Sequence, residues 1–406
     1  MHSVSQQLLA NSGLGQTAFA IESEAYKSAG SRVSALTPAY IIVPRSNSPQ
    51  EAYHAACRSL PNPPSPHATT TDSPPQASHV VSHPSDEDPG TRIGPYHNCH
   101  YIASGVTASV YRSDSLALKV ITETRPLEPH NPHREAKILA LLKKPVIPLL
   151  ATFRDHEQRL VLAFPYMPLT LAALLDNHQQ PPSPPLTSPQ IRSIFADLFS
   201  ALAYIHDLGI IHRDVKPSAV LLASPTGPAY LSDFGTAWHP TLSAASEPPD
   251  AKILDIGTGP YRAPEVLFGD TSYGTGVDMW AAGAVLAECC LSRPLFESRP
   301  AHEDGNQLGL ILSIFKTVGS PTRESWPEAA GFRTPPFEMY RAFEGKGWGE
   351  VLPGVGEGWR ELIAGLVRYS GRVEAEEVSR PRGGVVGQMG SKANDLQALN
   401  FRCMKE

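Results

Sequence analysis

Charged side chains recur at defined intervals in the middle of this 406-residue chain. In chain order, the short motifs that contain them are Ala117-Leu118-Lys119, Glu135, His212-Arg213-Asp214-Val215-Lys216-Pro217 and Asp233-Phe234-Gly235. An ammonium group can hold phosphate as a point charge. A carboxylate can ligate a hard cation such as magnesium, or can align a hydroxyl by accepting its hydrogen bond. These residue types are therefore suited to phosphate chemistry.

In this order and at these spacings, and with Ala263-Pro264-Glu265 farther along, the motifs resemble those of the eukaryotic protein kinase family. The resemblance covers roughly residues 98 to 378. Each tripeptide alone is weak evidence, whereas the ordered set is specific. The resemblance implies transfer of the terminal phosphoryl group of ATP, with magnesium, to a protein hydroxyl. Catalysis of that transfer is mainly positioning and charge stabilisation.

The resemblance also implies a role for each charged group. Lys119 would hold the α and β phosphates of ATP, and Glu135 would orient its ammonium group. Asp233 would hold magnesium. Asp214 would accept a hydrogen bond from the incoming hydroxyl and align it for attack.

Two further residues are typical of the serine/threonine kinases. Lys216 and Thr258 match the serine/threonine form of the family's motifs, so the acceptor is expected to be a protein serine or threonine. By the same resemblance Phe164 would be the gatekeeper behind the adenine pocket, and Met167 would offer backbone hydrogen bonds to adenine. The residues expected at the nucleotide site are Ile102, Gly105, Val110, Ala117, Phe164, Met167 and Leu221. The apolar ones among them could equally be ordinary core residues.

A longer string in the second half resembles the cyclin-dependent kinase branch. It comprises Tyr261-Arg262-Ala263-Pro264-Glu265, Asp278-Met279-Trp280-Ala281-Ala282-Gly283, Arg293-Pro294-Leu295-Phe296 and Thr317-Val318-Gly319-Ser320-Pro321-Thr322. This resemblance implies that Asp278 braces the backbone of the catalytic loop and that Arg372 pairs with Glu265.

Two departures from the family pattern affect the nucleotide site. Ala219 stands where the family has an asparagine that binds a second magnesium ion, and a methyl group cannot ligate a metal. Either one ion suffices, or Ser218 or a water molecule takes over, or turnover is impaired. The glycine-rich loop keeps only Gly105, and the alanines at 103 and 108 restrict the approach of the backbone to phosphate. This loop predicts a reduced affinity for nucleotide.

Two other departures affect regulation. Ile253 stands where cyclin-dependent kinases carry an activating threonine, and Arg213 would ordinarily pair with the phosphate on that threonine. Our hypothesis is that Asp250 or Asp255 replaces the phosphate. Prolines at positions 129 and 132 shorten the helix that a cyclin would grip, so no cyclin partner is expected.

Three of these departures, the altered cyclin-contacting helix, the missing activating threonine and the degenerate glycine-rich loop, occur together in the monomeric fungal cyclin-dependent-kinase-activating kinases. Segment 253–262 also resembles the corresponding segment of that group. The resemblance implies a monomer that acts on a protein substrate, the activation-loop threonine of a cyclin-dependent kinase. The alternative is a pseudokinase that serves as a binding or scaffolding protein. Ala219 and the loop alanines favour the pseudokinase, whereas the retained charged residues favour the enzyme.

The elements that must position these residues predict an α+β, bilobal protein kinase fold. Residues 100–112 are typical of two strands around a turn, and 116–121 and 160–164 of further strands. Residues 133–142 predict a helix. A longer helix is expected to be capped by Ser188, to have Pro189 at its first position and to stop at Gly209. A small antiparallel-sheet N-lobe is thus followed by a larger helical C-lobe.

The domain boundaries follow from shifts in composition. The chain has 40 prolines, and the stretch from Pro61 to Gly90 combines many of them with no aromatic residue, leucine, isoleucine or methionine. Such a stretch cannot bury enough apolar surface to offset the entropy of ordering it. We therefore predict a disordered Pro/Ser-rich extension over 1–95, the N-lobe over 96–167, the C-lobe over 168–378 and an irregular tail over 379–406.

Composition also narrows the possible partners and locations. The net charge is −6 and no lysine/arginine block is present, so neither nucleic acid nor a membrane is an expected partner. Five scattered cysteines do not indicate a disulfide framework and favour a reducing, intracellular setting, in the nucleus, the cytoplasm or both. The longest apolar stretch, 281–291, is too short to span a bilayer.

Overall fold

The computed structural model describes residues 89–123, 127–143, 145–179, 186–298, 306–337 and 341–379. Most of the predicted N-terminal extension, nearly all of the predicted tail, and the Pro-rich segment 180–185 lie outside these residues. Cys57 and Cys403 also lie outside them. Within the described part of the chain, no helix is long and apolar enough to cross a membrane.

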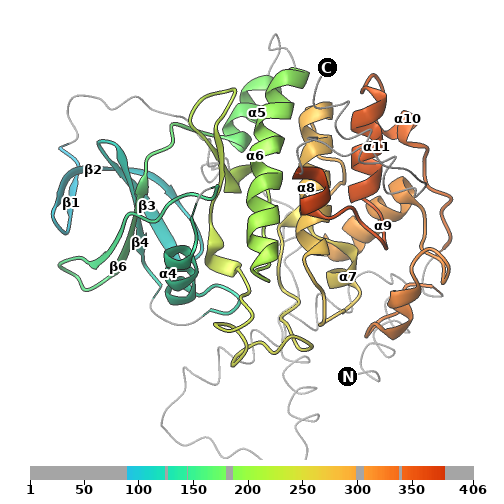
Figure 1. Cartoon of the computed structure of the whole chain (residues 1–406), viewed down its shortest axis with the longest axis horizontal. Coiled ribbons are helices and arrows are strands. Elements are labelled where there is room, and N and C mark those ends of the chain that lie inside the picture. Colours follow the sequence, from blue (N-terminus) through green and yellow to red (C-terminus); the bar gives the residue numbers. More distant parts are fainter. Residues whose placement is uncertain are drawn as a thin grey trace, which may run out of the picture. The chain divides into compact units, whose positions relative to one another are not determined.

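The predicted two-lobed α+β architecture is confirmed, and its first lobe is an antiparallel sheet (Figure 1). Its strand order is β1-β2-β3-β4-β6-β5. The strands are β1 (Thr91–Ile93), β2 (Tyr96–Ser104), β3 (Ala108–Ser113), β4 (Leu116–Ile121), β5 (Ala151–Arg154) and β6 (Leu160–Pro165). The sheet thus starts at Thr91, before the predicted N-lobe boundary at residue 96.

Strand β4 positions the lysine of the candidate site. Leu118 and Val120 are buried in the small core of the N-lobe, together with Val161 of β6. Because side chains alternate along a strand, Lys119 points to the opposite face. The strand predicted over 116–121 is therefore confirmed, and its period of two places the amine outside this core.

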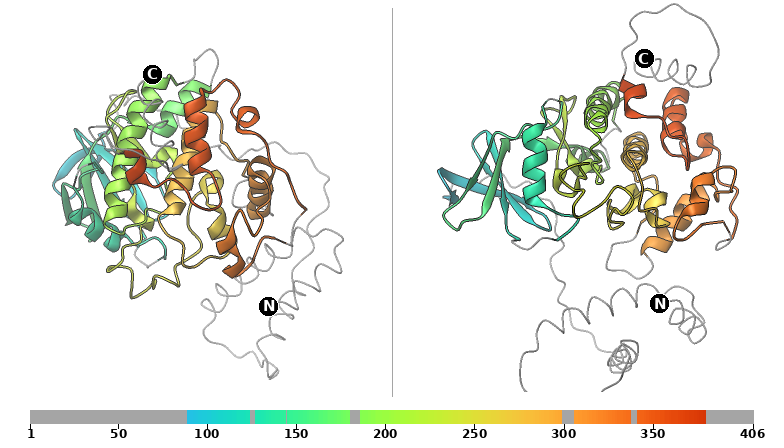
Figure 2. Two further views of the ribbon diagram at one scale, coloured as in Figure 1. Left: turned by 45° about the vertical axis from the view of Figure 1, so that its right-hand side comes forward. Right: turned by 60° about the horizontal axis from the view of Figure 1, so that its bottom comes forward.

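Helix α4 (Pro132–Leu141) positions Glu135. Its N-cap is Asn131, whose side chain accepts a hydrogen bond from the Arg134 backbone N–H, and Pro132 occupies the first turn, where its missing N–H costs nothing. Ile138 and Leu139 of α4 are buried in the large core, which the helical lobe forms. Figure 1 and the right view of Figure 2 accordingly show α4 between the N-lobe strands and α6.

The second lobe is built from helices and a small three-stranded sheet. The helices are α5 (Leu171–Gln179), α6 (Ser188–Asp207), α7 (Pro264–Leu267), α8 (Gly276–Leu291), α9 (Asn306–Val318), α10 (Trp348–Val351), α11 (Glu357–Leu366) and α12 (Ala375–Ser379). The sheet has the order β7-β8-β9, with β7 (Leu169–Thr170), β8 (Val220–Leu222) and β9 (Ala229–Leu231).

The predicted start of α6 was one residue too late. Thr187, not Ser188, is the N-cap, and it forms a capping box with Gln190. The helix ends near the predicted stop, where Gly209 adopts a φ of 71°.

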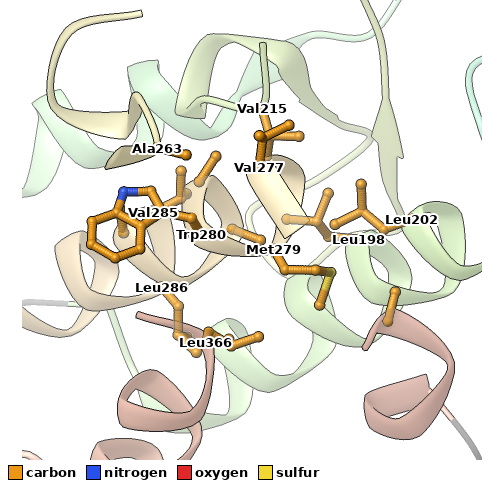
Figure 3. Close-up of a cluster of buried hydrophobic side chains, with 14 of the residues drawn as sticks. Leu198, Leu202, Val215, Ala263, Val277, Met279, Trp280, Val285, Leu286 and Leu366 are labelled. Atoms are coloured by element: carbon orange, nitrogen blue, oxygen red, sulfur yellow. The ribbon is translucent and has the colours of Figure 1, made fainter. Parts of the chain in front are cut away.

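Helix α8 runs through the middle of the large core. Figure 3 shows its side chains among Leu198 and Leu202 of α6 and Leu366 of α11. A Cβ at Gly283 would lie 2.7 Å from the Leu366 Cβ, so glycine is needed for the close approach of α11. Val215, next to Asp214, belongs to the same buried cluster, so the catalytic loop (residues 212–217) packs against the core of this lobe.

The predicted pair of Arg372 and Glu265 is also confirmed. The Arg372 Nη1 and Nη2 atoms lie 2.5 and 2.8 Å from the Glu265 Oε1 and Oε2 atoms. Arg372 Nη1 also donates to the carbonyl oxygen of Gly276, 2.9 Å away. This bidentate pair ties α7 to the start of α8 and to the segment that follows α11.

Candidate active site

Lys119 and two carboxylates meet in one cluster. The Lys119 Nζ atom lies 2.7 and 2.9 Å from the two carboxylate oxygens of Glu135 and 2.9 Å from Asp233 Oδ1. The three groups are far apart in sequence, and β4, α4 and the segment after β9 bring them together. The Glu135 side chain is 2% exposed and that of Asp233 is 50% exposed, so the cluster is closed on one side and open on the other.

The Lys119 ammonium attracts both carboxylates of this cluster, which repel each other. The Lys119 ammonium holds the pKa of Asp233 far below its usual range. Burial disfavours the Lys119 ammonium, but the carboxylates of Asp233 and Glu135 outweigh that effect and raise its pKa. Burial raises the pKa of Glu135, although the Lys119 ammonium opposes that shift. Lys119 is therefore charged and Asp233 ionised at neutral pH.

The backbone around Asp233 is shaped for this close contact. Asp233 adopts a left-handed conformation with a φ of 61°, which an aspartate tolerates better than most residues. A Cβ at Gly235 would lie 3.5 Å from Asp233 Oδ1 and 3.6 Å from Glu135 Oε2. Phe234 between them is fully buried and packs edge-on against the ring of His212, with the ring centroids 4.9 Å apart. The distances at Gly235 are ordinary van der Waals contacts, so space alone does not require glycine beside the two carboxylates and the amine.

A second cluster forms around Asp214. Lys216 Nζ lies 2.5 Å from Asp214 Oδ2, and the Thr258 hydroxyl donates to Asp214 Oδ1 over 2.6 Å. Lys216 Nζ also donates to the Thr258 hydroxyl, 3.1 Å away. Both carboxylate oxygens thus accept hydrogen bonds, one of them from a threonine hydroxyl, which is the kind of bond an alcohol acceptor would make.

The predicted bracing of the catalytic loop by Asp278 is confirmed. The backbone N–H groups of His212 and Arg213 donate to Asp278 Oδ2 and Oδ1, each over 2.8 Å, and His206 Nε2 lies 2.9 Å from Oδ2. Burial opposes ionisation, but the interactions with His206 and His212 together outweigh it and lower the pKa of Asp278. Arg213 has a φ of 71°, a backbone conformation that must be held by its surroundings.

We expect Asp278→Asn to lower the free energy of unfolding by about 1–3 kcal/mol at neutral pH, because its amide would leave one buried N–H donor unpaired. The pKa of the Asp278 carboxylate is lower in the folded protein than its ordinary value. Its contribution to stability is therefore complete above that ordinary value and is lost as the pH falls through the lower folded value. The stability difference from the wild type should therefore shrink below about pH 4.

Urea unfolding of both proteins across the pH range measures this difference. Asp255→Asn is the matched control, because Asp255 is an exposed acid whose substitution should change stability little. Equal stabilities of the wild type and Asp278→Asn at neutral pH would contradict the bracing role.

The predicted nucleotide-site residues occupy several elements. The strand register sets Val110 opposite Lys119, and Ala117 opposite Phe164. Phe164 and Met167 are half-buried and pack against the large core, as does Leu221 of β8. Ile102 is exposed on β2, and the Gly105 N–H donates to the Ala108 carbonyl oxygen, which closes the turn between β2 and β3. Their contacts with a nucleotide remain predictions.

The residues present fit one magnesium ion. Among the described residues there is no group of three or more histidine, cysteine, aspartate or glutamate side chains that could hold a metal by itself. Asp233 offers a half-exposed carboxylate, and magnesium in phosphate chemistry typically takes one or two carboxylates together with substrate phosphates and water. Ala219 is buried and Ser218 is exposed, so whether Ser218 replaces the missing ligand remains a prediction.

The hypothesis that Asp250 or Asp255 pairs with Arg213 is wrong. Asp255 is 82% exposed and lies 3.4 Å from Arg262, and Asp250 is also exposed. Arg213 instead pairs with Glu247, a residue that sequence reasoning missed. Glu247 lies outside all the family motifs, and a local pattern gives no sign that this part of the chain folds back onto the catalytic loop.

Comparison with known proteins agrees with this geometry. The protein kinase domain matches residues 96–370. Serine/threonine-protein kinase csk1 of Schizosaccharomyces pombe is 40% identical over 182 residues, which cover 44% of this chain and 58% of csk1, somewhat more than half its length. Serine/threonine-protein kinase CAK1 of Saccharomyces cerevisiae is 29% identical over 57% of this chain and 76% of that protein. Cyclin-dependent kinase 7 of Xenopus laevis is 31% identical over 73% of this chain and 82% of that protein. The resemblance to the cyclin-dependent-kinase-like branch and its fungal members is confirmed.

Proposed function

We infer that this chain, which belongs to the protein kinase family, is a serine/threonine kinase that phosphorylates the activation-loop threonine of a cyclin-dependent kinase. The observation that carries the inference is the simultaneous presence of the two clusters, one around Lys119 and one around Asp214. The first contains the groups that bind a triphosphate, and the second contains the groups that align a hydroxyl. A scaffold that has lost catalysis has no need to keep both.

The chain's own side chains carry out most of the chemistry. The Lys119 ammonium, oriented by Glu135, binds the α and β phosphates of ATP. Asp233 is the residue that would hold a magnesium ion, which neutralises phosphate charge when bound. Asp214 accepts the hydrogen bond of the acceptor hydroxyl and takes up its proton as the new O–P bond forms and the bond to ADP breaks. Lys216 stabilises the Asp214 carboxylate at 2.5 Å.

The same proposal includes a monomer that works without a cyclin, inside the cell in the nucleus, the cytoplasm or both. The short helix α4 supports independence from cyclin, because it begins at Pro132 and offers little surface before Glu135. The proposed acceptor, a threonine of a cyclin-dependent kinase, is supported by the similarity to csk1 and CAK1 and by the resemblance of segment 253–262 to the fungal activating kinases. The intracellular setting is supported by the scattered cysteines.

The acceptor is tested with a catalytically inactive cyclin-dependent kinase as substrate, so that it cannot label itself. The purified chain and Mg-ATP should place one phosphate on its activation-loop threonine, as identified by mass spectrometry. The same inactive kinase with its activation-loop threonine replaced by valine should remain unlabelled. The inactive kinase that keeps this threonine should remain unlabelled when Asp214→Asn is the enzyme. Labelling of another residue would support kinase activity but refute this acceptor. If no protein or peptide is labelled, the pseudokinase is favoured.

We expect Ala219→Asn to raise kcat by about tenfold or more, which corresponds to about 1.4 kcal/mol of activation free energy. The added amide oxygen would supply a ligand for a second ion, so the magnesium concentration for half-maximal rate should also change. Steady-state rates across a magnesium titration measure both quantities. Asp250→Asn, at an exposed position with no role in the site, is the control and should leave both quantities unchanged. An unaltered kcat in Ala219→Asn would mean that a second ion does not limit turnover.

A further inference from the structure

We propose that Glu247 is a positioning residue whose carboxylate holds the catalytic groups in place. Because this negative charge is always present, the kinase works without a phosphate on its activation segment, the stretch between Asp233 and Glu265. The inference rests on the proposed function for its activity readout. Glu247 touches neither the Lys119 cluster nor the Asp214 cluster directly and acts through two arginines.

The Glu247 carboxylate joins three parts of the chain. Its Oε2 and Oε1 atoms lie 2.5 and 3.1 Å from Nη1 and Nη2 of Arg213, in the catalytic loop. Its Oε1 atom lies 3.4 Å from Nη1 of Arg134, on α4. Its Oε2 atom accepts a hydrogen bond from the Ile253 backbone N–H over 3.1 Å. The side chains of Glu247 and Arg213 are fully buried.

Each arginine is the direct neighbour of a residue of the candidate active site. Arg134 precedes Glu135, which orients Lys119, and Arg213 precedes Asp214. Arg213 Nε also donates to the Thr236 carbonyl oxygen over 2.5 Å, just after the segment that carries Asp233. Because Glu247 fixes both guanidinium groups, it fixes the backbone on both sides of the site. The left-handed conformation of Arg213 makes this support necessary.

The surrounding charges show why a permanent anion is required. Arg134 has a second partner in Glu128, whose Oε2 atom lies 3.0 Å from Nη1, but Glu247 is the only carboxylate paired with Arg213 among the described residues. The Tyr273 hydroxyl lies 3.1 Å from Arg213 Nη1, and it donates to the Ile253 carbonyl oxygen over 2.7 Å. Lys252 lies over the rings of Trp238 and Tyr273 and adds positive charge. Without Glu247, the Arg213 charge would be buried without a counter-ion.

This arrangement replaces a covalent switch. A phosphate group on a side chain can bridge two arginines, but it can be added and removed. Here the anion is the Glu247 carboxylate, which cannot be added or removed. Ile253 contributes only its backbone N–H and carbonyl groups to this network. The active arrangement is therefore independent of phosphorylation of the segment.

The test compares Glu247→Gln, which has the same shape without the charge, with Glu247→Asp, which keeps the charge, and with the control Asp255→Asn. We expect Glu247→Gln to lower kcat by about tenfold or more while KM for ATP changes less than about twofold. Glu247→Asp should recover part of the loss, and Asp255→Asn should match the wild type. Phosphatase treatment should leave the wild-type rate unchanged.

Three results would overturn the proposal. They are a wild-type kcat in Glu247→Gln, equal losses in Glu247→Gln and Glu247→Asp with equal falls in Tm, and loss of wild-type activity after phosphatase treatment. If the wild type phosphorylates nothing, the proposed function fails, and Glu247 is then judged by hydrogen exchange. Amides of residues 131–139 and 210–216 should exchange faster in Glu247→Gln than in Asp255→Asn, and unchanged exchange would refute the positioning role.

Discussion

Replacing Asp214 by asparagine is expected to lower kcat by about 10²- to 10⁴-fold, the range that a positioned acid–base group contributes. Asparagine keeps the shape and one acceptor oxygen, but it cannot take up the proton of the hydroxyl and cannot pair its charge with Lys216. KM for ATP should stay within about twofold, because Asp214 does not contact the Lys119 cluster in the structure. Initial rates over a matrix of ATP and protein-substrate concentrations measure both constants.

Asp250→Asn is the matched control for this variant. Asp250 is an exposed aspartate, so the same change of charge should leave kcat unaltered. The thermal unfolding curve of Asp214→Asn should also show a folded protein. A kcat within threefold of the wild type would mean that Asp214 is not the group that aligns the hydroxyl.

Replacing Lys119 by methionine is expected to lower kcat/KM for ATP by about 10²-fold or more. The ammonium makes charge-assisted hydrogen bonds, each of which contributes roughly 1.5–3 kcal/mol, and methionine has no donor to phosphate. The change also leaves the buried Glu135 without its partner. We expect the free energy of unfolding to fall by about 3 kcal/mol, at the lower end of the cost of breaking a buried pair, because Glu135 can take up a proton.

Lys119→Arg separates the two effects. Arginine keeps the positive charge beside Glu135 and Asp233, so it should preserve most of the stability, but its planar fork does not reproduce the point charge of the ammonium. We therefore expect Lys119→Arg to unfold near the wild-type denaturant midpoint and yet to bind ATP weakly. Calorimetry and denaturant unfolding supply the measurements. Wild-type ATP affinity in Lys119→Met would contradict the role of the amine.

The sequence was sufficient to predict the positions of the side chains that lie in or next to a motif. The alternation of Leu118, Lys119 and Val120 predicts a strand with the amine on one face, and the structure has that strand. The ordered motifs predict that Lys119, Glu135 and Asp233 converge, and their contacts of 2.7–2.9 Å follow that expectation. Local pattern works here because each side chain's direction is set by its own strand, helix or turn.

Other features were missed for physical reasons. Thr187 has a glutamine three residues later and Ser188 does not, so the capping box favours Thr187 over Ser188 as the N-cap. Strand β1 has only Ile93 buried, which is too little for an alternating pattern. Glu247 gave no signal, because its burial depends on how a long loop folds back onto Arg213 rather than on its neighbours in sequence.

The central claim is that the two clusters act together as a working phosphotransferase, and one measurement tests it most directly. The wild-type chain is incubated with Mg-ATP and a threonine-containing peptide, and nucleotide binding, ADP and phosphopeptide are measured in the same sample, with Asp214→Asn purified in parallel. We predict that ADP and phosphopeptide accumulate in equal amounts in the wild-type sample and that neither accumulates with Asp214→Asn. Nucleotide binding without any phosphopeptide, or equal product from both proteins, would contradict the claim.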